Sequence, residues 1–219
     1  MELFCFGQAG YGTYQQLLFI EEQLDKIEPD FILIQMCDND FIDNYAALEY
    51  TSNYKVGVRR PYLDGNGELY YRIPIPSWKQ VLGKSKFLDL LIKKLEVIFY
   101  DVNKVAQYQI AEGTSPYKPY EESKVITGQI LDKMKTTFGD IPYLIYLVAN
   151  ADPYKKDLIK LCEERAMPYT MKPLDTLYLR DKERLDVRSS DGYHWTELGH
   201  RVVGEILVGE VENILKVAE

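Results

Sequence analysis

Apolar runs of two kinds alternate along the chain, and together they predict alternating strands and helices. Short, nearly unbroken apolar runs have the length of buried strands, and they occur at 1–7, 31–36 and 142–149, with a shorter fourth at 168–173. Longer stretches with apolar residues three or four positions apart predict helices at 14–27, 84–105, 120–138, 154–166 and 196–215. Strands that alternate with helices indicate an α/β fold with a mainly parallel sheet.

Two segments refine this expectation. The run "FILIQM" at 31–36 lacks any alternation of apolar and polar residues, which predicts a strand buried on both faces. Residues 45–80 break the rhythm, and "RRPYLDGNGELYYRIPIP" within them predicts a β-hairpin that turns at Asp64–Gly67. We interpret 45–80 as an insertion or flap within one domain that covers 1–219. Thr13 is the expected cap of the helix at 14–27.

The composition of the chain argues against several classes of protein. The chain has 219 residues, 46% of them hydrophobic, which is enough for one domain with a sizeable core. A net charge of −8 and a pI near 5.0 argue against a protein that tracks nucleic-acid phosphates. No apolar run approaches the roughly 18 to 20 residues that span a bilayer, and the first residues lack the pattern of a signal peptide. Three widely spaced cysteines do not suggest a disulfide framework or a zinc knuckle.

Polar residues gather just past the predicted strands. They form the blocks "GQAGYGT" (7–13), "CDND" (37–40) and "NADP" (150–153), and "SSDGYHW" (189–195) precedes the last helix. In open α/β sheets ligands bind at the carboxyl ends of the strands, so these blocks are candidates for one ligand site. The alternative is that Asp38 and Asn39 only cap the turn that follows them.

The two histidines, His194 and His200, add a candidate catalytic group. Asp191 precedes His194 by three residues, and Gly192 allows the bend that brings its carboxylate back to a ring nitrogen. Such a bond fixes the tautomer and stabilises the imidazolium, as in the Asp-His half of a hydrolase triad. The alternative is a surface loop with a helix-capping aspartate. His200 lies on another face of the last helix, where packing or a local hydrogen bond is expected, and a metal site built from both histidines is disfavoured.

Taken in order, these blocks resemble the SGNH or GDSL-like hydrolase superfamily of serine esterases and acylhydrolases. The glycine block "CFGQAGYGTYQQ" is similar to the family block whose glycine, here Gly10, gives a backbone amide to the oxyanion hole. "CDND" resembles the Asn-Asp block, with Asn39 as the side-chain donor and Asp40 as support of the loop. "DGYH" matches the Asp-x-x-His block through Asp191 and His194, and "LGH" matches the glycine-histidine that often follows it.

The resemblance covers the whole chain and carries several implications. It implies a three-layer α/β/α fold with a flavodoxin-like sheet, and hydrolysis of a small-molecule or carbohydrate ester without a cofactor or metal. Cys37 and Asp38 stand where the family has glycines, and the Gly-Asp-Ser block with the nucleophile is absent. We therefore expect a chain that lacks the first family strand, is inactive alone, and self-associates through an exposed sheet edge.

Two other functions remain open. One is a thiol hydrolase in which Cys37 is the nucleophile beside His194 and Asp191, although a cysteine at a strand end more often only packs. The other is a ligand-binding relative without catalysis. Ser189 and Ser190 are too close to His194 in the chain to be attractive nucleophiles.

Overall fold

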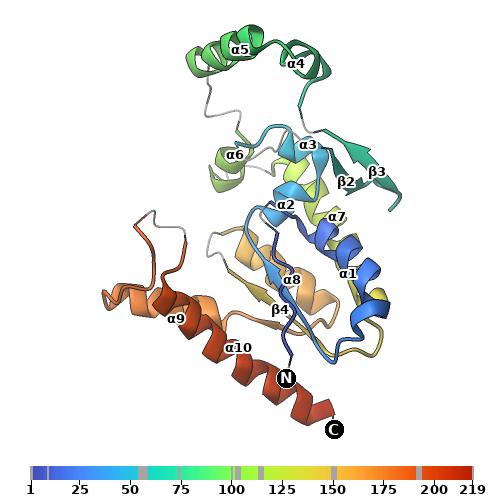
Figure 1. Cartoon of the computed structure of the whole chain (residues 1–219), viewed down its shortest axis with the longest axis vertical. Helices are drawn as coiled ribbons and strands as arrows, with labels where there is room; N and C mark the ends of the chain where they lie inside the picture. The colour runs from blue at the N-terminus through green and yellow to red at the C-terminus, as the bar shows by residue number, and fades with distance from the viewer. Residues whose placement is uncertain are drawn as a thin grey trace. The chain divides into compact units, whose positions relative to one another are not determined.

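The computed structural model describes residues 2–8, 10–53, 59–73, 75–99, 101, 105–112, 116–148, 152–190 and 194–218. Within them the chain is mixed α/β, with ten helices, a three-stranded parallel sheet and a two-stranded antiparallel sheet (Figure 1). The predicted α/β class with a parallel sheet is therefore confirmed. The chain divides into two compact units: a first unit, Met1–Phe19 with Asn39–Leu131, and a second unit, Ile20–Asp38 with Asp132–Glu219.

The parallel sheet lies in the second unit and has the order β1-β4-β5. β1 (Ile32–Met36) pairs residue by residue with β4 (Tyr143–Leu147), which pairs in turn with β5 (Tyr169–Thr170). All five residues of β4 are buried, as expected of a central parallel strand. The predicted strand at 142–149 is thus confirmed, whereas the one at 168–173 is confirmed only at Tyr169–Thr170, because a helix begins at Lys172.

The prediction that 31–36 is buried on both faces is wrong. In β1 buried and exposed residues alternate, and Leu33 is 39% exposed. The exposed positions, Leu33 and Gln35, share one face of the strand, and β1 also stands at the end of the strand order. The unbroken apolar run therefore predicted the strand correctly but not which of its residues are buried.

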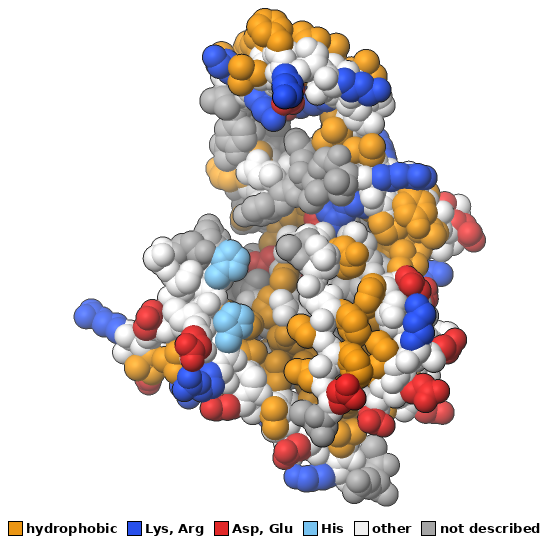
Figure 2. Space-filling model, viewed as in Figure 1, with side chains coloured by type: hydrophobic (Ala, Val, Ile, Leu, Met, Phe, Trp, Pro, Cys, Tyr) orange, Lys and Arg blue, Asp and Glu red, His pale blue; other side chains and the backbone are white. Residues whose placement is uncertain are grey.

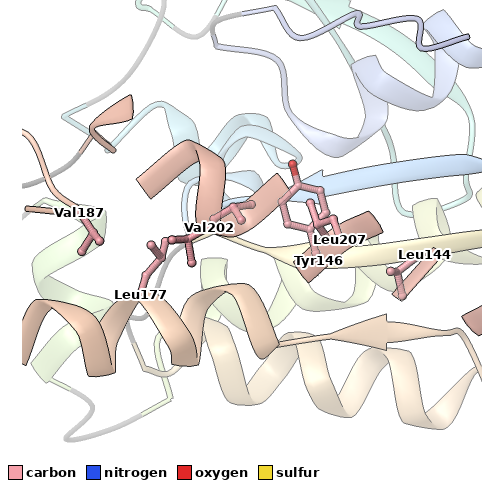
Figure 3. Close-up of a cluster of buried hydrophobic side chains, with 7 residues drawn as sticks. Leu144, Tyr146, Leu177, Val187, Val202 and Leu207 are labelled. Atoms are coloured by element: carbon pink, nitrogen blue, oxygen red, sulfur yellow. The ribbon is translucent and has the colours of Figure 1, made fainter. Parts of the chain in front are cut away.

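Three whole helices belong to the second unit: α8 (Tyr154–Glu164), α9 (Lys172–Lys182) and α10 (Glu197–Ala218). The C-terminal parts of α1 (Thr13–Ile27) and α7 (Lys118–Phe138) belong to it as well. The sequence pattern predicts no helix where α9 lies, and the first two residues of α9 fall in the strand predicted at 168–173. A buried cluster joins β4, α9 and α10 (Figure 3); its members are Leu144, Tyr146, Leu177, Val187, Val202, Val203 and Leu207. This cluster explains α9, because Leu177 supplies an apolar contact that a short, charged helix needs to stay folded.

The first unit contains short helices and the predicted hairpin. The helices are α2 (Asp40–Asp43), α3 (Ala46–Glu49), α4 (Ser77–Leu82), α5 (Lys86–Ile98) and α6 (Ala106–Glu112). β2 (Arg60–Leu63) pairs antiparallel with β3 (Leu69–Arg72), which confirms the hairpin. In its turn Gly67 has a φ of +80°, a left-handed conformation that favours glycine, and Asp64 Oδ1 accepts the N–H of Glu68 at 2.9 Å.

Two further predictions in this part of the chain are wrong. Residues 2–7 form no strand, and their apolar side chains are exposed, with Leu3 at 80%. The helix expected at 84–105 is shorter than predicted: α5 covers Lys86–Ile98, and a separate helix that the sequence did not predict, α4, precedes it. The break lies at Gly83–Ser85, where Ser85 Oγ accepts the N–H of Leu88 and so caps α5. No helix in the described part of the chain combines the length and apolar character that crossing a membrane requires.

Candidate functional site

The glycine loop of the first unit leads directly into α1. Gly10 has a φ of +79°, and Gly12 precedes the helix, where its N–H donates to Gln15 Oε1 at 3.2 Å. Asn44 Oδ1 accepts the N–H of Tyr14 at 3.2 Å, so α1 is capped by its own third residue and by a residue of another segment. The expectation that Thr13 caps this helix is wrong, because Thr13 lies within α1 and its buried hydroxyl makes no hydrogen bond to any described residue.

Close packing explains the glycine at position 12. A Cβ built there would lie 2.9 Å from Asp43 Cβ and 3.1 Å from Asn44 Oδ1. The glycine loop and α2 therefore approach each other too closely for any side chain at this position.

Asn39 stands at the start of α2, and its side chain does not cap that helix. Its backbone carbonyl accepts the N–H of Asp43 at 2.8 Å, while its side-chain Nδ2 donates to Asp43 Oδ2 at 2.7 Å. The capping alternative for Asn39 thus finds no hydrogen bond to support it. Asp40 follows within α2 and is buried, at 2% exposure. The side-chain amide of Asn39 is consequently held in one orientation by the Asp43 carboxylate.

Arg60 of β2 is the centre of this part of the structure. Its side chain is 1% exposed, and its guanidinium nitrogens donate hydrogen bonds to groups from several segments. Nη1 lies 2.8 Å from Glu49 Oε1 and 3.5 Å from Asp43 Oδ1. Nε and Nη2 lie 3.1 Å and 2.7 Å from Gln15 Oε1, and Nη2 also donates to the Gly10 carbonyl. One guanidinium therefore binds the glycine loop, α1, α2 and α3 together.

The charges around Arg60 are unequal, since one buried cation faces two buried carboxylates. Burial, opposed by Arg60 and reinforced by the charge of Glu49, raises the pKa of Asp43 to about 6. The hydroxyl of Tyr62 donates to Glu49 Oε2 at 2.7 Å, and burial raises the pKa of this tyrosine well above its usual range. Tyr62 therefore stays neutral and satisfies the second oxygen of Glu49.

Gly10 and Asn39 thus belong to one hydrogen-bonded network. The chain of contacts runs from the Gly10 carbonyl through Arg60 to Asp43, and from Asp43 to the Asn39 amide. The two residues are distant in sequence, and the bonds join them through buried groups. The arrangement therefore fixes the Gly10 carbonyl and the side-chain amide of Asn39.

His194 lies in the second unit, between the end of α9 and the start of α10. Its carbonyl accepts the N–H of Ser189 at 2.8 Å, and its side chain is exposed. Asp191 lies outside the described residues, so its bond to His194 stays a prediction. His200, on α10, packs edge-on against Trp195 with ring centroids 5.3 Å apart, which confirms the packing role expected of it.

The cysteines occupy different environments. Gln35 Nε2 lies 3.8 Å from the half-buried Cys37 Sγ, and Cys5 is exposed. Cys162 on α8 is buried, and burial raises the pKa of its thiol to about 12, which keeps it protonated. No group of three or more histidine, cysteine or acidic side chains in the described ranges is arranged to hold a metal ion.

A hollow of about 730 Å³ lies in the first unit between the end of β3 and the start of α4. Aromatic side chains from three segments line it, among them Tyr50, Tyr71 and Trp78. Neither Gly10 nor Asn39 belongs to its lining. It is therefore separate from the network around Arg60.

Sequence reasoning missed the residues that organise the network, namely Gln15, Asp43, Glu49, Arg60 and Tyr62. Arg60 follows another arginine, Arg59, and nothing in the sequence distinguishes the two. The one available signal is the period of two in a strand, which places Arg60 and Tyr62 on the same face. That signal does not say which face of the hairpin is buried.

Comparisons with known protein families, with curated proteins and with solved structures find no match to this chain.

Proposed function

We propose that the chain is part of an ester hydrolase of the SGNH or GDSL-like class, with the three-layer, flavodoxin-like architecture of that class. In this proposal the Gly10 N–H and the Asn39 side-chain amide are the oxyanion donors, and Asp40 supports their loop. His194 is the general base and Asp191 orients it. The substrate is a small-molecule or carbohydrate ester.

The observation that carries the proposal is the shared network of Gly10 and Asn39. Oxyanion donors are effective when they are held in place before the reaction, because they then cost no reorganisation as charge develops. Arg60 holds the Gly10 carbonyl, which fixes the backbone next to the proposed Gly10 N–H donor, and Asp43 holds the Asn39 amide. Asn39 Nδ2 has two hydrogens, so the bond to Asp43 leaves one for a substrate oxygen.

The proposed roles divide the reaction as follows. A serine hydroxyl attacks the ester carbonyl while His194 takes its proton, and the imidazole later returns a proton to the leaving alcohol. The carbonyl oxygen gains negative charge, and the Gly10 and Asn39 donors stabilise it by roughly 3 kcal/mol for one donor. The resemblance assigns no serine among the 219 residues as the nucleophile, so the serine is the unassigned part of the triad.

The test uses p-nitrophenyl acetate turnover and active-site labelling. The coding sequence upstream of Met1 is read for a Gly-Asp-Ser block, and the chain is expressed with and without it. We expect the longer protein to hydrolyse the ester and to react with a fluorophosphonate probe. Asn39→Ala should lower kcat by about 100- to 1000-fold with little change in KM, because an oxyanion donor acts on the transition state.

Asn66→Ala, in the exposed hairpin turn, is the matched control and should leave turnover unchanged. Unchanged kcat in Asn39→Ala, or full activity in His194→Ala, would remove these residues from the mechanism. Labelling of Cys37 by a thiol alkylator with parallel loss of turnover would favour the thiol hydrolase. Labelling by neither reagent would favour a binding protein without catalysis.

A further inference from the structure

Helices α4 and α5 carry apolar side chains on an open surface. None of the described side chains between positions 77 and 99 is buried. Phe87 is 73% exposed and Ile98 is 71% exposed. We define the α4–α5 surface by six of its exposed apolar residues: Trp78, Val81, Phe87, Leu91, Leu95 and Ile98. Leu90 and Phe99 in the same segment are exposed as well.

The spacing on α5 makes these residues one continuous stripe. Phe87, Leu91, Leu95 and Ile98 follow one another at intervals of four, four and three, and so share one helix face. Figure 2 shows hydrophobic side chains gathered over α4 and α5, with lysines beside them. An amphipathic helix normally buries such a stripe, so its exposure indicates a surface that binds another body.

The charge of the same segment indicates the nature of that body. Residues 77–99 contain five lysines and two acidic residues, a net charge of +3 in a chain of net charge −8. Lys93 pairs with Asp89 at 2.7 Å, and Lys79 pairs with Glu96. The other three lysines of the segment make no ion pair within the described part of the chain; they are Lys84, Lys86 and Lys94.

We propose that the α4–α5 surface docks on an anionic lipid bilayer. Its aliphatic and aromatic stripe enters the boundary between head groups and acyl chains, while the lysines extend their stems and keep their ammonium groups among the anionic head groups. α5 has 13 residues and is roughly 20 Å long, which is too short to span the hydrocarbon core. It therefore lies in the plane of the interface. This inference is independent of the proposed hydrolase function.

The same charges argue against a second copy of the chain as the occupant. Contact between two such surfaces would bring two segments of net charge +3 together, and like charges across an interface oppose association. An anionic bilayer satisfies both the apolar stripe and the lysines.

The test measures binding to vesicles of phosphatidylcholine with and without phosphatidylglycerol. In a Trp195→Phe background Trp78 is the only tryptophan, so its fluorescence reports on α4 alone. We expect co-flotation with anionic vesicles, a blue shift of Trp78 emission, and quenching by brominated lipid. Replacing Lys84, Lys86 and Lys94 by glutamine should weaken binding by about two orders of magnitude, at roughly fivefold for each lysine.

Phe87→Ser combined with Ile98→Ser should weaken binding at least about tenfold, since it removes two inserted side chains. The matched control is Leu179→Ser combined with Val208→Ser, which changes two exposed apolar residues on other helices, α9 and α10, and should bind as the parent does. The proposal is overturned if anionic vesicles are not bound, if uncharged vesicles bind equally well, or if the α5 variants bind unchanged. It is also overturned if the α5 variants abolish a dimer while vesicle binding is absent, which would assign the surface to a second copy.

Discussion

Arg60 shows how a buried charge is tolerated at the scale of one residue. A guanidinium that is 1% exposed loses nearly all of its hydration, and the loss is offset only if its donors find acceptors. Here two carboxylates, an amide oxygen and a backbone carbonyl accept from it. The planar fork of arginine reaches all four groups at once, which the single ammonium of lysine would not do.

We expect Arg60→Met to lower the free energy of unfolding by about 3 to 5 kcal/mol, because Asp43 and Glu49 would then be buried without a cation. Urea unfolding measures this loss. Arg59→Met is a control at the adjacent position, where the exposed guanidinium stacks on Tyr71 at 4.8 Å; it should cost within about 0.5 kcal/mol. Equal losses in the two variants would show that Arg60 is not the centre of the network.

Asp43 makes the free energy of unfolding depend on pH, and the direction of its pKa shift gives the sign of that dependence. Its pKa is near 3.8 in the unfolded chain and about 6 in the folded protein, so the folded state binds more protons between these values. The free energy of unfolding contributed by Asp43 is therefore highest below about pH 4 and falls as pH rises through about 6, by on the order of 3 kcal/mol in total. Asp43→Asn should remove this slope, and urea unfolding from about pH 4 to 7 compares the two proteins. Parallel pH profiles would contradict the prediction.

At the same scale, sequence reasoning singled out Gly10 and Asn39 as candidates but not the residues to which the structure joins them. Gly10 and Asn39 came from short blocks whose residue types suit a known chemistry. Arg60 belongs to the network because of which face of a hairpin is covered, and that is a tertiary property. Arg59 and Arg60 are adjacent residues of the same type, and only the structure shows that Arg59 is exposed and Arg60 is buried.

At the scale of elements, periodicity predicted β4, α7, α8, α10 and the hairpin, each of which has either a covered face or a turn with its own chemistry. It failed where the environment departs from the average. Residues 2–7 are apolar but form no strand, and β1 is apolar on a face that stays exposed. α9 was missed because its stability depends on contacts with the β4 and α10 cluster rather than on a strong pattern of its own.

Two glycines of α10 should respond to alanine in opposite ways. A Cβ at Gly199 would lie 2.3 Å from the Val187 carbonyl oxygen and 3.0 Å from Trp195 Cβ, whereas one at Gly204 meets nothing within 4 Å. Gly199→Ala should cost about 1 to 3 kcal/mol, because the helix and the backbone at Val187 must move apart. Gly204→Ala should add up to about 1 kcal/mol through helix propensity. Thermal unfolding of both variants checks the signs, and stabilisation by Gly199→Ala would show that the helix does not pack this tightly.

At the scale of the whole molecule, net charge opposes the contacts that the apolar surfaces favour. The exposed face of β1 with Leu33 and the α4–α5 surface are both open to association, while a net charge of −8 keeps molecules apart at neutral pH. β1 stands at one end of the strand order, so its edge is where we propose that copies pair. The balance between these effects depends on pH.

We expect light scattering by the protein to be greatest near pH 5, where the net charge approaches zero at the pI of about 5.0. The raised pKa of Asp43 lowers the stability of the folded state less at this pH than at neutral pH, so we expect the associating species to be native, with a circular dichroism spectrum like that at neutral pH. Leu33→Lys should reduce the scattering, since a lysine on an edge strand discourages pairing with another strand. Phe87→Ser combined with Ile98→Ser should reduce the scattering less. The segment 77–99 has a net charge of +3, so two such segments repel each other even where the net charge of the whole chain is near zero. If the α5 variant suppresses association and Leu33→Lys does not, the sheet edge is not the self-associating surface.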